Sequence, residues 1–446
     1  MIRQTPSLLR STVVLLCTLS PLVRAQEALG SRSGSPTAQS ASAETDDPAV
    51  SSYSPSSERL RKALAYCSAR YRHFFVNALW GILIPLLILG LRVAPRLRDW
   101  VERVSSTRFV QFALYAPLLL LGFAVLTLPS DVWDHNLERR YGLSIQGWVS
   151  WLADCVTNLI ILLMVATFLI WILYAVIRCS PRRWWFYFWL ASIPVLLGIF
   201  FVQPMVIDPL FFHFTPLRAS QPALVAELER VVQHGGMDLP PERMFEMNAS
   251  SKLTSLHAYV SGFGASKRAV IWDTTLREAT TLEVLFVFGH EMGHYVLFHL
   301  PKEFSIDAGL VLVPLYVGFR LVAWMVARWG QCWRIRALDD LASLPLLILV
   351  LGLLAFLTMP AFNAVSRYFE HEADRYGLEV IHGIVPNQGR VAARFFEKSG
   401  EINLADPNPG TFVKIWFFDH PPRPERVHFA ATYDPWSHGQ KTTYVP

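Results

Sequence analysis

Residues 281–300 read TLEVLFVFGHEMGHYVLFHL, an apolar run with helical periodicity that contains the pattern HExxH. On a helix, residues four positions apart share one face, so His290 and His294 can reach one metal ion while Glu291 projects beside them. This is the first half of a zinc peptidase site. Because two positions of the pattern are wildcards and the run is rich in strong hydrophobes, a pair of structural histidines packed between helices is the alternative. A third ligand elsewhere in the chain would separate these two interpretations.

The composition is that of a membrane protein with soluble segments. The chain has 446 residues, of which 52% are hydrophobic and only 17% are charged. It is therefore too apolar for a soluble protein and too long for one ordinary core. The net charge of +5 is modest, and the basic residues lie beside apolar segments, so we expect no nucleic-acid partner. The five cysteines form no CxxC pair, which indicates neither a disulfide framework nor a thiolate zinc site.

The N-terminus is typical of a secretory signal peptide, which we assign to residues 1–25. Arginines precede a short apolar stretch at 11–22, and Val23-Arg24-Ala25 offers a cleavage site after its last residue. The apolar stretch is short for a transmembrane helix. Residues 26–73 are expected to form a disordered, non-cytoplasmic tail and a juxtamembrane segment, because the first part is rich in Ser, Ala, Gly and Pro.

Six later segments have the length and apolarity of membrane helices. They are residues 74–91, 109–129, 155–177, 184–207, 308–327 and 341–362. The sequence therefore predicts a four-helix transmembrane region at 74–207 and two transmembrane helices within 304–362. The stretches 208–303 and 363–446 look soluble, and they must meet in space if they form the two halves of one metalloprotease domain.

The soluble-looking stretches contain signals for both helix and strand. Residues 223–235 have helical periodicity, whereas 258–261 and 268–273 alternate around a Gly262-Phe263-Gly264 turn, which predicts a β-hairpin. Thr280 and Glu283 have the spacing of a capping box that starts the HExxH helix. The expected fold class is an α-helical polytopic membrane protein with an α+β zinc protease domain, built from the HExxH helix and a small antiparallel sheet.

Arginines in the short loops predict the topology. They are concentrated between spans one and two, three and four, and five and six, whereas the opposite short loop has only Arg139 and Arg140. The positive-inside rule then puts the three Arg-rich loops in the cytoplasm. We therefore expect an integral multi-pass membrane protein whose catalytic side is non-cytoplasmic, and periplasmic in a bacterium. Basic residues that flank the first span on the supposed outer side run against this prediction.

Residues 363–374, NAVSRYFEHEAD, supply a candidate third ligand. Glu370 and Asp374 are one helical turn apart, on the face that also carries Asn363 and Arg367. The Glu370 carboxylate would complete a His₂Glu zinc set that leaves a fourth position open for water, as a catalytic site needs. Asp374 is placed to accept a hydrogen bond from a ligand imidazole and hold its tautomer. Without the HExxH motif, a charge cluster near the membrane interface would be the preferred interpretation.

Residues 420–426, HPPRPER, are a candidate for stabilising negative charge in the transition state. Prolines stiffen the turn that carries His420, and its imidazole could therefore be fixed over a tetrahedral intermediate. Arg426 could position this imidazole or bind the product carboxylate. An ordinary surface turn has the same short pattern. Five further histidines have no such spacing and are expected to be structural or exposed: His257, His299, His371, His382 and His428.

The ordered combination of HExxH, two spans, NxxSRxxExxAD and HPPxxxR resembles a known family. This family is the membrane zinc endopeptidases of the type I CAAX prenyl protease group, with the related bacterial heat-shock membrane protease, which are gluzincins. The resemblance covers residues 74 to about 427. It implies that His290, His294 and Glu370 bind zinc.

The same resemblance implies roles for other residues. Glu291 would be the catalytic base, and Asp374 the supporting acidic residue. Residues of the first hairpin strand would form an edge strand that pairs with the substrate backbone: Ala258, Tyr259, Val260 and Ser261. The chain departs from the family in having His257 where the family usually has Asn. The first of the family's seven spans would correspond to the short segment 11–22.

We therefore expect a zinc-dependent endopeptidase with one Zn²⁺ per subunit, acting on membrane-associated protein substrates at the lipid bilayer. Its task would be either CAAX-type processing or membrane-protein quality control. Glu291 would take a proton from the attacking water and return it to the leaving amine. An intramembrane site-2-type protease would need an Asp ligand in the last two spans, and neither contains one. A proteolytically silent membrane scaffold with structural zinc is the alternative from another class, against which the open ligand position and Glu291 argue.

Overall fold

Six helices in the described part of the chain are long and apolar enough to cross a membrane. The structure, a computed structural model, describes residues 53, 55–254, 256–262 and 267–445. The six are α2 (Ser57–Gly90), α4 (Arg108–Tyr141), α5 (Trp148–Cys179), α6 with its continuation (Trp184–Leu210), α11 (His299–Trp329), and α12 with its preceding turn (Leu341–Val380). Each includes all or nearly all of one of the predicted spans, so their number and order are confirmed. The predicted signal peptide, residues 1–25, lies outside the described residues.

The long helices extend well beyond a bilayer. Helix α2 has 34 residues, which corresponds to about 51 Å of helix against about 30 Å of hydrocarbon core. The boundaries that the sequence indicated near residues 74, 304 and 362 therefore fall inside continuous helices. The segment that the sequence indicated as juxtamembrane, before residue 74, is helical from Ser57 onward and continuous with the span. The start of α2 packs in a hydrophobic cluster, where Ala63, Tyr66 and Cys67 are buried against residues around the end of α4 and against Leu404.

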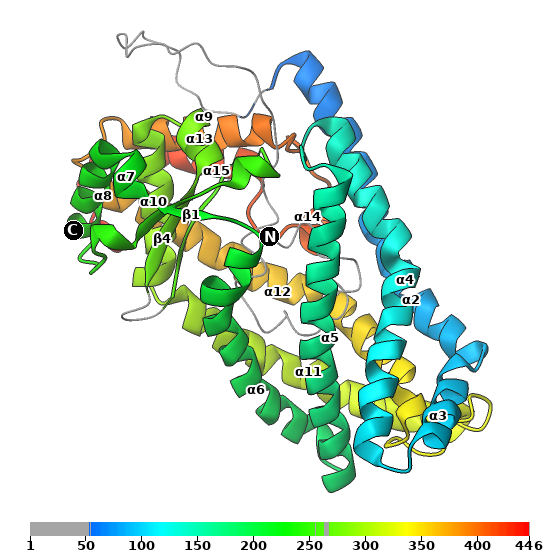
Figure 1. The fold of residues 1–446 in the computed structure, drawn as a ribbon. Helices are drawn as coiled ribbons and strands as arrows, with labels where there is room; N and C mark the ends of the chain where they lie inside the picture. Colours follow the sequence, from blue (N-terminus) through cyan, green and yellow to red (C-terminus); the bar gives the residue numbers. More distant parts are fainter. Residues whose placement is uncertain (1–52, 54, 255, 263–266, 446) are drawn as a thin grey trace.

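A four-stranded sheet lies at the other end of the molecule from the far tips of these helices (Figure 1). Its order is β1-β2-β4-β3, where β1 is Phe214–Pro216, β2 Met244–Met247, β3 Ala258–Ser261 and β4 Arg268–Trp272. Strands β3 and β4 pair antiparallel, which confirms the predicted hairpin. However, β2 and β4 are parallel, so the sheet is mixed and not antiparallel throughout as predicted. The difference arises because β2, which the sequence analysis did not identify, runs beside β4 in the same direction.

Helix α10 (Thr281–Val296) carries the HExxH motif and starts as predicted. The Thr280 side chain accepts from the Glu283 backbone N–H, and the Glu283 carboxylate accepts from the Thr280 backbone N–H, which confirms the capping box. The expectation of one helical run through residue 300 is wrong. Phe298 has a φ of 56° and separates α10 from α11. Apolar residues continue across this break, so hydrophobic periodicity alone could not reveal it.

Shorter helices surround α10 and share one hydrophobic core with it (Figure 1). They are α7 (Leu217–Ser220), α8 (Pro222–His234), α9 (Asp273–Glu278), α13 (Gln388–Ile402) and α15 (Arg423–Thr432), whereas α14 (Thr411–Phe417) packs against α12. Helix α8 confirms the helix predicted at residues 223–235 within one residue at each end. The core includes Phe286, Met292 and Phe396, which are nearly inaccessible to solvent. The two soluble-looking stretches therefore meet around the HExxH helix.

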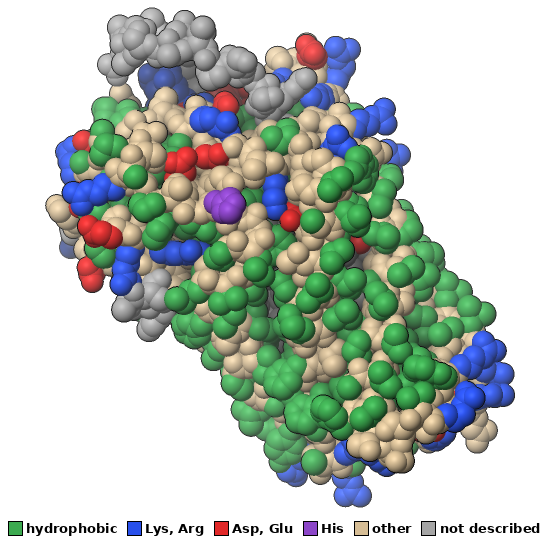
Figure 2. Space-filling model, viewed as in Figure 1, with side chains coloured by type: hydrophobic (Ala, Val, Ile, Leu, Met, Phe, Trp, Pro, Cys, Tyr) green, Lys and Arg blue, Asp and Glu red, His purple; other side chains and the backbone are tan. Residues whose placement is uncertain are grey.

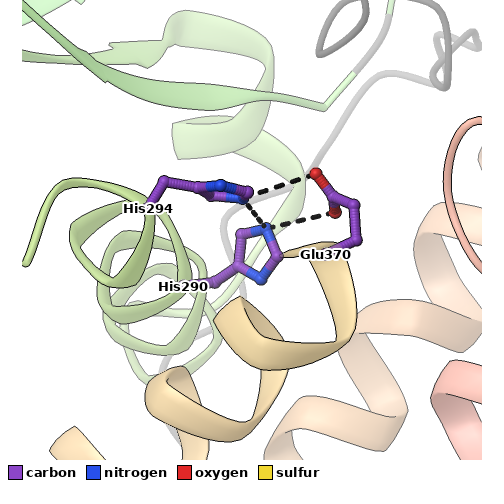
Figure 3. Close-up of side chains that lie close together, drawn as sticks. All are labelled: His290, His294 and Glu370. Atoms are coloured by element: carbon purple, nitrogen blue, oxygen red, sulfur yellow. Dashed lines mark hydrogen bonds and ion pairs between the residues drawn. The ribbon is translucent and has the colours of Figure 1, made fainter. Parts of the chain in front are cut away.

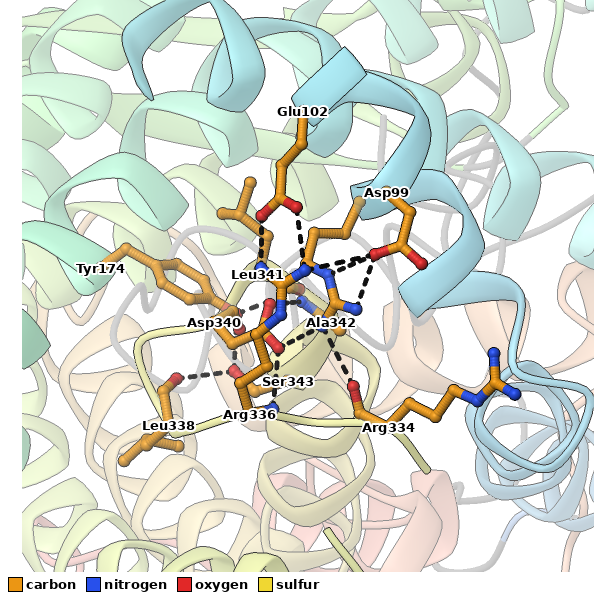
Figure 4. A network of polar contacts seen from close by, with 11 residues as sticks. Asp99, Glu102, Tyr174, Arg334, Arg336, Leu338, Asp340, Leu341, Ala342 and Ser343 are labelled. Atoms are coloured by element: carbon orange, nitrogen blue, oxygen red, sulfur yellow. Dashed lines mark hydrogen bonds and ion pairs between the residues drawn. The ribbon is translucent and has the colours of Figure 1, made fainter. Parts of the chain in front are cut away.

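The far end of the helical bundle is closed by polar contacts between helix α3 (Val93–Val104) and the loop between α11 and α12. Buried Arg98 forms an ion pair with Asp340. Arg336 pairs with Glu102 at 2.6 Å (Figure 4). These contacts bring two of the Arg-rich loops together. In Figure 2, hydrophobic side chains cover the long-helix part, and Lys and Arg gather at its far end. The surface around the sheet mixes both charge signs instead.

Candidate metal and catalytic site

Three glycines allow α10 and α12 to pack closely. A Cβ added at Gly377 would lie 3.0 Å from the His290 backbone N, and one at Gly293 would lie 3.0 Å from the Tyr376 side chain. A Cβ at Gly289 would lie 2.8 Å from Val380. Such distances are shorter than ordinary van der Waals contact, so each of these positions requires the absence of a side chain. The close approach brings the HExxH face of α10 against the acidic face of α12.

His290, His294 and Glu370 converge where these helices meet (Figure 3). The two imidazole Nε2 atoms are 3.3 Å apart. His290 Nε2 is 3.5 Å from Glu370 Oε2, and His294 Nε2 is 3.4 Å from Glu370 Oε1. Ligands about 2.1 Å from a tetrahedral metal ion lie about 3.4 Å from one another. The donor set therefore has the size of one face of a small tetrahedral metal centre.

The Glu370 carboxylate further supports a metal at this position. Glu370 is only 5% exposed. Its Oε2 atom is buried and has no hydrogen-bond partner among the described residues. Its nearest nitrogens, His290 Nε2 at 3.5 Å and a terminal nitrogen of Arg426 at 3.7 Å, make only ion-pair contacts. A buried carboxylate oxygen without a hydrogen-bond donor is costly, and a metal ion would reduce that cost. The residues therefore fit a metal ion in both their spacing and their chemistry.

Asp374 lies behind His290, as predicted. Its Oδ1 is 2.9 Å from His290 Nδ1, the ring nitrogen that faces away from Glu370. Burial lowers the pKa of the His290 imidazole, but hydrogen bonds and charges from Asp374 and Glu370 outweigh it and raise the pKa to about 9. The arrangement fixes the orientation of the ring and directs Nε2 toward the site.

Arg426 contacts Asp374, and among the described side chains it forms no hydrogen bond or ion pair with His420, so the contacts do not support the first of its two predicted roles, positioning the His420 imidazole. Its Nε donates to Asp374 Oδ2 at 2.8 Å, and one terminal nitrogen donates to the other carboxylate oxygen. The guanidinium also lies over the Phe396 ring, 4.3 Å from its centroid. Buried Arg426 thus holds Asp374 in place. The short motif could not reveal this partner, because it lies 52 residues away in the chain.

His420 reaches the site from the loop before α15. Its Nε2 lies 3.1 Å from Glu370 Oε1, and its Nδ1 lies 2.8 Å from Asp419 Oδ1. Burial lowers the pKa of His420, but the carboxylates of Glu370 and Asp419 raise it to about 10. Asp419 therefore positions this imidazole and favours its charged form. An acidic residue directly before the histidine is a signal that the sequence analysis left out.

Polar residues of α12 that come before Glu370 form hydrogen bonds with the backbone of the segment before His420. Asn363 Nδ2 donates to the Trp416 carbonyl at 2.9 Å. Arg367 donates to the Phe418 carbonyl at 2.5 Å. Two members of the NxxSRxxE pattern thus fix the backbone just upstream of the loop. This explains physically why those residue types stand on the Glu370 face.

Glu291 lies beside the ligand set on the wall of a cavity. The cavity encloses about 1000 Å³ including its open mouth, and Glu291, His420, Glu370 and the two motif histidines line it. Burial raises the pKa of the Glu291 carboxyl group, although the neighbouring imidazoles lower it. A carboxyl group with a raised pKa is suited to accept and return a proton near neutral pH.

The predicted substrate strand borders the same cavity. Strand β3 pairs only with β4 and is the last strand of the sheet, so its other edge has no strand partner among the described residues. Tyr259 and Val260 of β3 line the cavity, and so does His257 directly before the strand. Burial lowers the pKa of His257 to about 3, so this imidazole is neutral. Its backbone N–H donates to Thr275 Oγ1 at 2.6 Å.

Two cavity residues were not assigned a site role from the sequence. His299 is only 2% exposed, and its Nδ1 lies 3.3 Å from His294 Nδ1, so the first residue of α11 packs against a candidate ligand. Arg423 lines the cavity from the first turn of α15. Arg423 stands inside the HPPRPER run, and this place in the sequence could have indicated a site role. The sequence analysis considered only the second arginine of the run, Arg426.

Two models of known protein families match the chain. The model of peptidase family M48 matches residues 218–433. The model described as CAAX prenyl protease N-terminal, five membrane helices, matches residues 39–213. In the described part of that second range, α2 to α6 are five helices. Neither match includes the segment predicted as a signal peptide.

Similar proteins cover most of the chain. The uncharacterized metalloprotease YhfN of Bacillus subtilis is 34% identical over 376 residues, which cover 83% of this chain and 85% of that protein. A CAAX prenyl protease 1 homolog of Homo sapiens is 25% identical and covers 73% of this chain and 77% of its own length. The crystal structure of S. mikatae Ste24p has a TM-score of 0.71 at 17% identity, covering 97% of this chain and 98% of that one. At that identity the structural likeness establishes the fold alone.

Proposed function

Because this chain belongs to peptidase family M48 and is a multi-pass membrane metalloendopeptidase, we propose that its metal is one zinc ion held by His290, His294 and Glu370. The observation that carries the proposal is the spacing of these three donors, between 3.3 and 3.5 Å. Two imidazoles and a carboxylate are a common ligand set of catalytic zinc. Bound there, zinc would lower the pKa of water toward ~7 and polarise the scissile carbonyl.

Glu291 is the general base in this proposal. It takes a proton from the water that attacks the peptide carbonyl, and it returns that proton to the leaving amine nitrogen. Its position on the cavity wall beside the ligands and its raised pKa support both steps. His420, held by Asp419, would donate a hydrogen bond to the oxygen on which negative charge develops.

Asp374 and Arg426 support the ligands without touching substrate. Asp374 holds His290 in the orientation that directs Nε2 to the metal, and Arg426 holds Asp374. The substrate backbone would pair with the free edge of β3, whose residues Ala258 to Ser261 are extended and two of which, Tyr259 and Val260, border the cavity. Main-chain pairing aligns a peptide without reading its side chains.

Substrates are membrane-associated proteins that reach the site from the bilayer surface. Helices α11 and α12 pass from the bundle directly into the site, and this continuity supports a catalytic centre at the membrane boundary. We also propose that the site faces the non-cytoplasmic side, since the Arg-rich loops lie at the opposite end of the bundle. The task is either CAAX-type processing or quality control of membrane proteins.

The test of this function is substitution of the proposed base. Glu291→Gln should reduce cleavage of a casein or peptide substrate by at least about a thousandfold, because neither proton transfer remains. Zinc content should stay at the wild-type level, since the ligands are unchanged. Glu278→Gln, at an exposed position on α9, serves as the matched control and should cleave normally. Wild-type turnover by the Glu291 variant would disprove the mechanism.

A further inference from the structure

Arg423 is a buried cation without a partner. Its side chain is only 9% exposed. It has no hydrogen bond or ion pair with any residue in the part of the chain that the structure describes. The pKa of its guanidinium is lowered to about 9 by burial and by the neighbouring Arg426 charge, although Asp374 and Glu370 raise it, so the group remains charged at neutral pH. A buried charge that no opposite charge contacts directly costs free energy, and a bound anion would reduce that cost.

The acidic groups nearest to Arg423 are already engaged. Asp374 forms its hydrogen bonds with Arg426 and His290. Glu370 contacts both motif histidines and His420. Glu425, in the same first turn of α15, pairs instead with Lys414 at the surface. None of these carboxylates is within ion-pair distance of Arg423, and Asp374 and Glu370 attract it only from farther away, so the guanidinium is left able to bind an anion directly.

The position of Arg423 indicates where such an anion would bind. His420 and Arg423 both line the catalytic cavity, and both also line a second cavity beside it. The second cavity lies between the start of α2 and the loop before α15, and its mainly apolar lining also contains polar residues such as Tyr71 and Asn403. Arg423 also begins α15, whose N-cap residue Pro422 provides no side-chain cap, so the positive end of the helix dipole adds to its charge. A peptide in the catalytic cavity would therefore meet the guanidinium just past His420.

We propose that Arg423 is a carboxylate-binding subsite that selects substrates carrying a carboxylate a few residues from the scissile bond. The inference rests on the proposed peptidase function and specifies its substrate class. Two sources have this chemistry, the free C-terminus of the substrate and an Asp or Glu side chain. A guanidinium binds either through two parallel N–H donors, and it gains most when it is already desolvated.

The test compares matched peptides in detergent-solubilised enzyme. One fluorogenic peptide is made with a C-terminal carboxylate and with a carboxamide, and a third version has the carboxamide and an internal Glu. For the wild type, kcat/KM for the free acid should exceed that for the amide by at least about tenfold. Arg423→Gln should bring this ratio close to one, and Arg423→Lys should leave an intermediate ratio. A ratio measured within each enzyme is insensitive to partial loss of folded protein.

A control variant and the peptide with an internal Glu show whether the effect is specific to Arg423 and which carboxylate it binds. Arg230→Gln removes an exposed arginine of α8 that pairs with Glu227, and it should retain the wild-type ratio. If the internal Glu restores cleavage of the carboxamide peptide, Arg423 accepts a carboxylate from a side chain. If it does not, Arg423 accepts only the carboxylate of the free C-terminus. A wild-type ratio near one, or an unchanged ratio in Arg423→Gln, overturns the proposal.

Binding distinguishes failure of this inference from failure of the proposed function. If no peptide is cleaved by the wild type, the peptidase function fails, yet the subsite can still be measured. The acid and amide peptides are then titrated against Glu291→Gln by fluorescence anisotropy. Acid binding that is at least about tenfold tighter, and that is lost when Arg423→Gln is added, supports the subsite. Equal affinities would overturn it.

Discussion

Glu370 contacts three imidazoles at once, and it therefore links the candidate metal ligands to His420. Its two oxygens lie within 3.5 Å of His290, His294 and His420. The first two imidazoles belong to the HExxH helix, and the third comes from a loop 50 residues further along the chain than Glu370. One carboxylate thus connects the ligand set to the residue that would stabilise developing negative charge.

The raised pKa of His290 predicts that zinc binding depends on pH. Its imidazole must lose its proton to coordinate a metal, and Asp374 and Glu370 raise its pKa to about 9. Protons therefore compete with zinc below that pH, and affinity should weaken about tenfold for each pH unit lost between about 8 and 7, as expected for one competing proton. Titration with a zinc-selective competing chelator measures this. An affinity that does not change over this range would contradict a raised pKa of the ligand imidazole.

The sequence was sufficient to predict the residues that lie within one helix. His290 with His294, and Glu370 with Asp374, are each four positions apart, and helical periodicity determines their common faces. Neither the partner of Arg426 nor the burial of Arg423 could be predicted. Both depend on how α15 packs against α13 and α12, and a local pattern carries no information on the packing of distant elements.

At the scale of elements, the contact between α10 and α12 creates the site. Gly377 lies one turn beyond Asp374 on α12, and it faces the backbone of His290. The packing surface and the ligand surface are therefore adjacent on the same helix. A small change in the distance between the helices would move Glu370 relative to both histidines.

Gly377→Ala should impair metal binding although alanine favours helix. The added Cβ would lie 3.0 Å from the His290 backbone N, and backbone cannot move aside cheaply, so we expect a destabilisation of about 1–3 kcal/mol and weaker zinc binding. Gly352→Ala is the matched control on the same helix, because its Cβ would meet nothing within 4 Å. Zinc content and thermal unfolding of both variants provide the measurement. Equal zinc retention in the two variants would contradict the packing argument.

Element types were predicted well from the sequence, but their ends were not. Apolar segments of membrane length revealed all six long helices, because hydrophobicity must match the bilayer. Their polar extensions, such as the start of α2 at Ser57, have no hydrophobic signal. The break at Phe298 has none either, since apolar residues flank it on both sides. Short strand β2 escaped detection because four residues give almost no periodicity.

For the whole molecule, the orientation in the membrane is the main prediction. Cys179 and Cys332 are free and exposed, and they lie in two of the Arg-rich loops. A membrane-impermeant maleimide should label both only from the cytoplasmic side in single-cysteine variants, and should label Lys441→Cys, exposed near the C-terminus, only from the other side. Buried Cys67 and Cys155 should react only after unfolding. The opposite labelling pattern would place the catalytic site in the cytoplasm.

The most direct test of the whole account is the zinc content of the purified chain and of Glu370→Ala, measured by inductively coupled plasma mass spectrometry after dialysis against a mild chelator. One ligand set is built from two helices, because α10 contributes both histidines and α12 contributes Glu370. We predict about one zinc per wild-type chain and almost none in the variant, because two histidines alone bind zinc weakly. Stoichiometric zinc in Glu370→Ala, or no zinc in the wild type, would contradict the account.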